Sequence, residues 1–255
     1  MFMKAINKQK FWFSLLLTSY LLFSYHTFEG WWYALIGSFL IVIISTRIWP
    51  GDYLKILGLS VNIRTALKSV LSGILVAIAS LLVMMLIGNR YSISIQYSNW
   101  KDYFHAIFYV LNEEMVLGAL AIYYLVKLKK INPVIASLLL AVGFSLIHFV
   151  FYRWIFEDKA TIQLLTLINL FLVGFVRNNL ILRSGHIGYS WALHAGWIVI
   201  MLGSEHVYPD NQTRLDEAEL FNLYLGSKEM LIVAILLTAG SIVEWIRASP
   251  GNTRH

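Results

Sequence analysis

Two adjacent glutamates, Glu113 and Glu114, lie in the middle of the apolar stretch YFHAIFYVLNEEMVLGALAIYYLV. The stretch is long enough to cross a membrane, for which a helix needs about 20 apolar residues. An ionised side chain at the bilayer centre costs roughly 3 kcal/mol even on lenient insertion scales. Membrane anchoring does not need such a pair, so the two glutamates predict catalytic chemistry or proton transfer.

Two histidines are candidates to act with the glutamates. His148 lies in the sequence GFSLIHFVFY and His194 lies in WALHAGW. At about 1.5 Å of rise per residue, both histidines and Glu113 are expected in one layer, roughly 6–15 Å below the outer face. A glutamate and two histidines in a water-accessible pocket can activate water, stabilise an oxyanion or bind zinc. The alternative is that each histidine only forms a hydrogen bond between helices.

The direct adjacency of Glu113 and Glu114 limits what the pair can do. Neighbouring residues of an α-helix point about 100° apart, so the two side chains are not expected on one face. One of the two glutamates is therefore expected to be structural.

Apolar helices must position these side chains. The chain has 255 residues, of which 58% are hydrophobic and 13% are charged, whereas a soluble domain has about 25% charged residues. We therefore expect an all-α, polytopic membrane protein of about eight transmembrane helices, built as a single integral membrane domain over residues 1–255. The expected spans lie near residues 11–26, 30–47, 68–88, 103–126, 133–152, 162–182, 188–203 and 229–246.

The Lys and Arg residues predict the orientation of the chain. The formal net charge is +6, but the basic residues form short clusters between apolar runs rather than a patch for nucleic acid. Their excess in alternate loops predicts cytoplasmic N- and C-termini. Short loops and the lack of a targeting extension suit a bacterial inner (cell) membrane. The longest outer loop, 204–228, contains LDEAELFNLYL, a candidate interfacial helix. The absence of cysteine excludes thiol catalysis, disulfides and thiolate zinc sites.

Three motifs in this order resemble the CAAX protease and bacteriocin-processing family of intramembrane proteases. They are the pair Glu113-Glu114, the F-x-x-x-H run from Phe144 to His148, and the H-A-G-W sequence that begins at His194. The resemblance covers about residues 100–203, which would form the catalytic half of the domain.

This resemblance implies a hydrolase that cuts a peptide bond near the membrane surface. Glu113 would be the general base that activates the attacking water, and His148 would help to hold and polarise that water. Glu114 would support the site, and His194 would stabilise the oxyanion. No cofactor is required in this glutamate-type mechanism, although zinc held by Glu113, His148 and His194 stays open as an alternative. The implied substrates are a membrane protein, a lipidated peptide or a leader peptide.

Two positions depart from the family pattern. The first motif of the family reads E-E-x-x-x-R, and Gly118 takes the place of the arginine. The last motif reads H-x-x-x-N, and Ile198 takes the place of the asparagine. Loss of one oxyanion donor can lower the rate by about 10²–10³, so these departures put the activity in doubt.

The polar cluster Arg177-Asn178-Asn179 in the sixth expected span has two interpretations. The arginine and one asparagine could replace the missing family residues. The interpretation that we prefer from the sequence is that Arg177 snorkels to the cytoplasmic surface while the asparagines bond to neighbouring helices.

Two other functions stay open at this stage. A catalytically impaired family member could act as a membrane binding or immunity partner, which Gly118 and Ile198 would favour. A proton-coupled transporter would need charged groups along a path through both leaflets, and repeated halves with broken helices, which the sequence does not show. We rank the transporter last.

Overall fold

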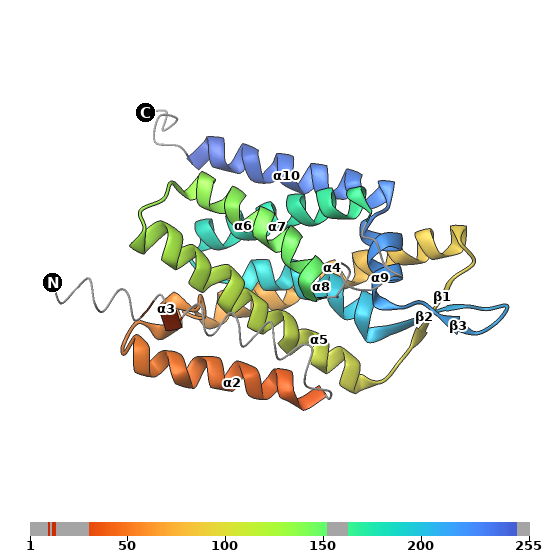
Figure 1. Ribbon diagram of the computed structural model, residues 1–255, viewed down its shortest axis with the longest axis horizontal. Helices are drawn as coiled ribbons and strands as arrows, with labels where there is room; N and C mark the ends of the chain where they lie inside the picture. The colour runs from red at the N-terminus through yellow and green to blue at the C-terminus, as the bar shows by residue number, and fades with distance from the viewer. Residues whose placement is uncertain (1–9, 11, 14–30, 152–162, 249–255) are drawn as a thin grey trace.

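The fold is described by a computed structural model, which places residues 10, 12–13, 31–151 and 163–248. Within these ranges the chain is mainly helical, as expected (Figure 1). The expected span near 11–26 lies almost entirely outside the described residues. The long helices are α2 Trp31–Ile48, α4 Ile63–Arg90, α5 Trp100–Glu113, α6 Pro133–Phe151, α7 Leu164–Ser184, α8 Gly188–Gly203 and α10 Lys228–Ala248.

The helix that carries the two glutamates changes geometry at this pair. The α-helical part α5 ends at Glu113, and the chain continues in the π-helical segments η1 Glu114–Leu120 and η2 Tyr123–Leu128. A π-helix is wider than an α-helix and turns its side chains by a different angle. The side chains of Glu113 and Glu114 therefore leave the helix where its winding changes.

Four of the described helices are long and apolar enough to cross a membrane: Ile63–Arg90, Trp100–Leu128, Leu164–Ser184 and Lys228–Arg247. Two shorter apolar helices, Trp32–Ile48 and Pro133–His148, lie beside them. The outward faces of α4 and α10 expose large aliphatic side chains such as Leu67, Leu86 and Leu236, which suits contact with lipid tails. The expected mainly helical class is confirmed for the described residues, and four of their helices have the length and composition to cross a membrane.

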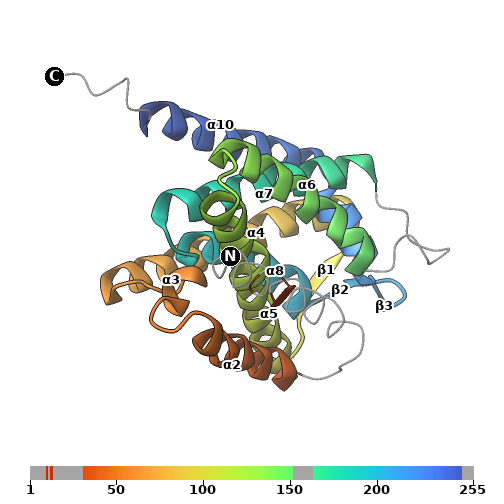
Figure 2. The same cartoon turned by 60° about the vertical axis from the view of Figure 1, so that its left-hand side comes forward.

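The helix α8 lies at the centre of the described bundle, packed against α4 and α5, while α6 packs along α7 (Figures 1 and 2). Small residues permit the close contact between α8 and α4. A Cβ atom at Gly196 would lie only 2.8 Å from the carbonyl oxygen of Gly73, so this crossing needs glycine, as is common between membrane helices.

A small antiparallel sheet covers one end of the bundle. It is formed by β1 Ser94–Tyr97, β2 Ser204–Tyr208 and β3 Thr213–Arg214, in the order β1-β2-β3. The sequence prediction contained no strand here, so the segment 204–228 has more regular structure than expected. Its expected helix is confirmed as α9 Glu217–Leu220 followed by the π-helical η3 Phe221–Leu225, and a capping box between Asp216 and Glu219 begins it.

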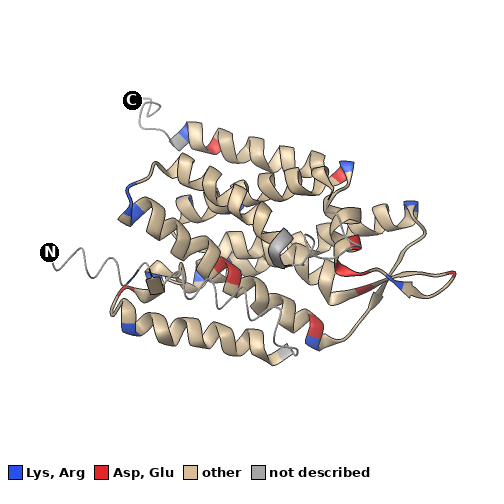
Figure 3. Cartoon of the chain, viewed as in Figure 1, with Lys and Arg blue, Asp and Glu red and all other residues tan. Residues whose placement is uncertain are grey.

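Charged residues gather at the two ends of the bundle (Figure 3). The end with α3 (Tyr53–Ile56), here named the basic end, carries Arg47, Lys55, Arg64, Lys68, Lys127, Lys129, Lys130, Arg183 and Arg247 against Asp52 and Glu244. The end with the sheet, here named the acidic end, carries Asp102, Glu205, Asp210, Asp216, Glu217, Glu219 and Glu229 against Arg90, Lys101, Arg214 and Lys228.

A buried histidine joins the sheet to η3. His206 on β2 has its Nδ1 atom 2.7 Å from the hydroxyl of Tyr224 and its Nε2 atom 3.4 Å from the carbonyl oxygen of Ile200. A carbonyl oxygen only accepts, so Nε2 carries the proton and Nδ1 accepts from the Tyr224 hydroxyl. Burial lowers the pKa of His206.

Acidification is expected to weaken this end of the protein. The folded-state pKa of His206 is lower than the unfolded value of about 6.5, so the unfolded state binds the proton first and stability falls as the pH drops through about 6.5. The fall continues until the lower, folded-state pKa is reached. His206→Gln does not titrate, and its melting temperature should depend less on pH between about 7.5 and about 5.5. An unchanged pH dependence in this variant would assign the effect to another group.

Candidate active site

The carboxylate of Glu114 is completely buried and lies between two nitrogen donors. Its Oε1 atom accepts hydrogen bonds from Nε of Arg177 on α7 and from Nδ1 of His194 on α8, the latter at 3.0 Å. The charge of Glu114 is therefore matched by the guanidinium inside the protein. An ion pair in this environment needs such geometry to offset the loss of hydration.

The carboxylate of Glu113 is also buried, but unlike that of Glu114 it is not hydrogen-bonded to Arg177 or His194. Its Oε2 atom lies 3.7 Å from Nε2 of His194, beyond hydrogen-bond distance. Neither oxygen forms a hydrogen bond of good geometry with a described residue. The side chain of Tyr109 lies within longer hydrogen-bonding reach of this carboxylate. An incompletely satisfied buried acceptor is costly in a resting fold, so these oxygens are suited to a water molecule or a reacting group.

The two adjacent glutamates meet on one imidazole ring. Glu114 lies at Nδ1 of His194 and Glu113 lies near Nε2. From the sequence, the two side chains are expected to point in different directions. That expectation did not consider that both can still reach one imidazole ring, because the ring has a nitrogen on each side. The change from α to π geometry at this point also alters the direction of the side chains.

The contact with Glu114 determines the tautomer of His194. A carboxylate paired with arginine accepts, so Nδ1 of His194 carries a proton and donates it to Glu114. In the neutral ring Nε2 then has a lone pair directed to the region of Glu113. This is the arrangement in which a carboxylate orients a histidine for proton transfer, and it makes Glu114 a positioning residue.

Arg177 is buried at the site, with only 1% of its surface exposed. Its Nη2 atom lies 3.3 Å from the backbone oxygen of Glu113, and its guanidinium lies 4.7 Å from the centre of the Phe144 ring. The preferred interpretation from the sequence, that Arg177 snorkels to the surface, is wrong. The signal that could have found it is an arginine with no acidic residue near it on its own helix, which predicts a partner on another helix.

The asparagines behave as that interpretation expected. Asn178 donates to the backbone oxygen of Ser137 on α6 at 3.0 Å. Asn179 accepts from the hydroxyl of Ser137 and donates to the hydroxyl of Ser241 on α10. Both amides therefore connect helices, and these contacts leave them no role as the missing oxyanion donor.

Gly118 leaves space for the guanidinium of Arg177. A Cβ atom at this position would lie 2.8 Å from Cδ1 of Ile181, 3.0 Å from Nη2 of Arg177 and 3.4 Å from Oε2 of Glu114. Thus the cation beside Glu114 comes from α7 instead of from the position one helical turn after Glu114.

Gly118→Ala is expected to lower stability although alanine favours a helix. Ile181 can rotate, but the guanidinium is held by Glu114, so overpacking should cost about 1–3 kcal/mol against a gain of about 1 kcal/mol in helix propensity. Gly143→Ala on α6 is the matched control, because no described atom lies within 4 Å of its new Cβ. Thermal unfolding should show a lower melting temperature for Gly118→Ala and not for Gly143→Ala. Equal melting temperatures of the two variants would mean that Gly118 has no steric role.

His148 belongs to the same cluster through an aromatic ring. Its Nδ1 atom lies 2.6 Å from the backbone oxygen of Phe144, so Nδ1 carries the proton and Nε2 has the lone pair. The Phe144 ring contacts His148 with centroids 4.6 Å apart and His194 with centroids 5.5 Å apart. Phe221 of η3 lies against His148 from the acidic end, with centroids 5.7 Å apart.

The side chain of Ile198 is surrounded by other apolar side chains. Ile198 is buried in a cluster that includes Phe144, Ala195 and Met201. An asparagine here would place an amide among aliphatic atoms at a cost of about 1–3 kcal/mol. The structure therefore uses this position for packing.

The donor set does not form an evident metal site. Among the described residues, no group of three or more His, Cys, Asp or Glu side chains has the geometry to hold a metal ion. Nδ1 of His194 and Oε1 of Glu114 already bond to one another beside the cation of Arg177. A zinc ion bound by Glu113, His148 and His194 would have to bind next to the positive charge of Arg177.

The fold and the site together define a mainly helical protein whose described residues include four candidate membrane-spanning helices and a buried Glu-His-Arg cluster. No protein-family model, curated protein or solved structure matches the chain. The family resemblance of the three motifs is therefore carried by their residues alone.

Proposed function

We propose that this chain is an intramembrane endopeptidase of the CAAX protease and bacteriocin-processing type, with Glu113 as its general base. The observation that carries the proposal is the buried carboxylate of Glu113, whose oxygens form no hydrogen bond of good geometry with a described residue and lie beside Nε2 of His194. A base that must take a proton from water needs this combination of a free acceptor and a desolvated site.

In this mechanism Glu113 accepts a proton from water while the water oxygen bonds to the carbonyl carbon of the scissile peptide. The carbonyl oxygen takes up the electron pair and becomes an oxyanion. Glu113 passes the proton that it took from water to Nε2 of His194, and the imidazolium then stabilises the oxyanion from Nε2, with Glu114 opposite to balance its charge. The C–N bond then breaks, the electron pair of the oxyanion re-forms the carbonyl group, and the proton on His194 passes to the leaving amine. His148 accepts from the attacking water through Nε2.

The surroundings that we propose are a bacterial inner membrane and an eight-helix topology with both termini in the cytoplasm. The excess of Lys and Arg at the basic end supports this orientation. The substrate would be a membrane protein or a lipidated or leader peptide, and no metal is needed for the route through Glu113. Zinc held by Glu113, His148 and His194 is the alternative.

A second candidate function is a catalytically impaired membrane binding or immunity partner. The packing of Ile198 in an apolar cluster favours it, because no amide donor stands at that position. A proton-coupled transporter is weaker still, since apart from the ends the charged groups gather in the one layer around Glu114.

The test compares peptide termini in membranes and in the medium of the native host, with the wild-type chain and Glu113→Gln at matched abundance. Termini present only with the wild type would support the peptidase and would reveal its substrate class. Identical termini with abundant wild-type protein would favour the binding partner.

A further inference from the structure

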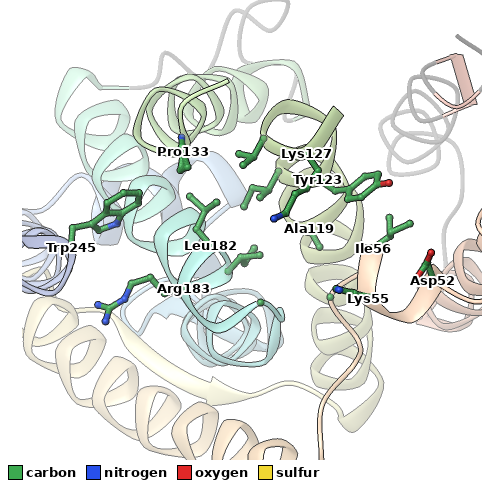
Figure 4. A pocket seen from close by; sticks show the side chains of 15 residues that line it. Asp52, Lys55, Ile56, Ala119, Tyr123, Lys127, Pro133, Leu182, Arg183 and Trp245 are labelled. Carbon is green, nitrogen blue, oxygen red and sulfur yellow. The ribbon is translucent and has the colours of Figure 1, made fainter. Parts of the chain in front are cut away.

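A cavity of about 860 Å³ lies at the basic end of the bundle, away from the proposed catalytic glutamates. It is bounded by α3, by η1 and η2, by the beginning of α6 and by the ends of α7 and α10 (Figure 4). Its size is within the range of about 300–1,000 Å³ that is usual for small-molecule sites. The function proposed above does not use it.

The lining of the cavity is amphipathic. Its walls are mainly apolar and include Ile122, Val126, Leu182 and Trp245. Three exposed cations and one acid also line it: Lys55, Lys127, Arg183 and Asp52. Lys127 and Lys55 lie on one side of the cavity, and Trp245 and Arg183 lie on the other (Figure 4).

The cations are not equally available. Arg183 is paired with Glu244 on α10 at 2.8 Å. The positive charge that the cavity offers to a ligand therefore comes mainly from Lys55 and Lys127, against the single charge of Asp52.

One wall of the cavity is held in place by the backbone. Gly58 has φ of +68°, and its carbonyl oxygen accepts from the backbone N–H of Ile187 at 2.9 Å. A Cβ atom at Gly58 would lie 2.7 Å from the side chain of Ile187. The segment after α3 is thus fixed against the turn between α7 and α8, so the cavity does not depend on a ligand to open.

These features match a molecule with an anionic head and an apolar chain. The cavity lies where the membrane helices end, which is the level of lipid headgroups, and basic pockets between membrane helices bind anionic headgroups. We propose that the cavity binds an anionic phospholipid, with its phosphate at Lys55 and Lys127 and an acyl chain along Ile122, Val126 and Leu182. This lipid site is independent of peptide hydrolysis.

The experiment measures lipid binding to the full chain in phosphatidylcholine nanodiscs with and without phosphatidylglycerol, by native mass spectrometry and by melting temperature. The test variant is Lys55→Gln with Lys127→Gln. The control is Lys101→Gln with Lys228→Gln at the acidic end, which changes the net charge by the same amount. At about fivefold for each basic residue, the test variant should lose about 25-fold of its preference for phosphatidylglycerol, and the control should lose little.

Two further arms decide the kind of ligand. Val126→Trp fills the cavity without changing charge and should also lose the lipid, whereas wild-type binding in a folded Val126→Trp protein would overturn the site. Glycerol 3-phosphate alone should not raise the melting temperature; full stabilisation by it would mean a soluble-phosphate site instead. Equal losses in the test and control variants would mean a general surface-charge effect. Because all readouts are binding and stability, these outcomes do not depend on whether the chain is a peptidase.

Discussion

Glu113→Gln is expected to abolish peptide cleavage while the protein stays folded. Glutamine has nearly the shape of glutamate but cannot accept a proton from water, and a general base contributes about 10²–10⁴ in rate. The change also replaces a buried carboxyl group that no cation hydrogen-bonds, so the melting temperature should be equal or higher. Both quantities can be measured with purified protein in membranes, once a substrate has been identified from its termini.

The control for this prediction is Glu244→Gln. Glu244 is exposed at the basic end, where it pairs with Arg183 and Arg247, so its loss should leave the rate unchanged. Glu114→Gln differs from both, since it should lower the rate through the orientation of His194 and also lower stability by leaving Arg177 unpaired. A wild-type rate in Glu113→Gln would show that another group activates the water.

Arg177→Met is expected to cause the largest loss of stability of any single change at the site. It leaves the carboxylate of Glu114 buried without its cation, and breaking a buried ion pair costs about 3–5 kcal/mol. Arg90→Met is the matched control, because the exposed pair between Arg90 and Glu229 should contribute only about 0–1 kcal/mol. Thermal or denaturant unfolding in the same detergent would measure the difference.

Moving the arginine from position 177 to position 118 tests whether the stability depends on the charge beside Glu114 or on the packing of the Arg177 side chain. The double variant Gly118→Arg with Arg177→Ala places the guanidinium four residues after Glu114 on the same helix, at a spacing where opposite charges meet. It should recover at least half of the stability that Arg177→Ala alone loses. Gly118→Arg by itself should be harmful, because two guanidinium groups would share one space. Additive effects of the two changes would mean that positions 118 and 177 do not serve the same charge.

The apolar runs determined much of the described bundle, because a helix that crosses lipid must satisfy its backbone internally and show apolar side chains outside. The isolated charges in those runs also determined the candidates Glu113, Glu114 and His194, since such charges are too costly to keep without a partner. The sheet was not predictable in this way. Its strands are short, and Ile95 pairs with His206 across more than a hundred residues, so local periodicity has nothing to indicate the pairing.

Only the tertiary structure decided how the charged groups are matched. Arg177 and Glu114 lie on different helices, and their pairing depends on how α7 packs beside η1. The same packing sets the tautomer of His194, because a hydrogen bond is made across a few ångströms of space and is independent of distance along the chain. The sequence by itself indicated that Glu113, Glu114 and His194 are polar groups in need of partners, but it did not indicate Arg177. The packing of the helices determined that Arg177 and His194 are the partners of Glu114.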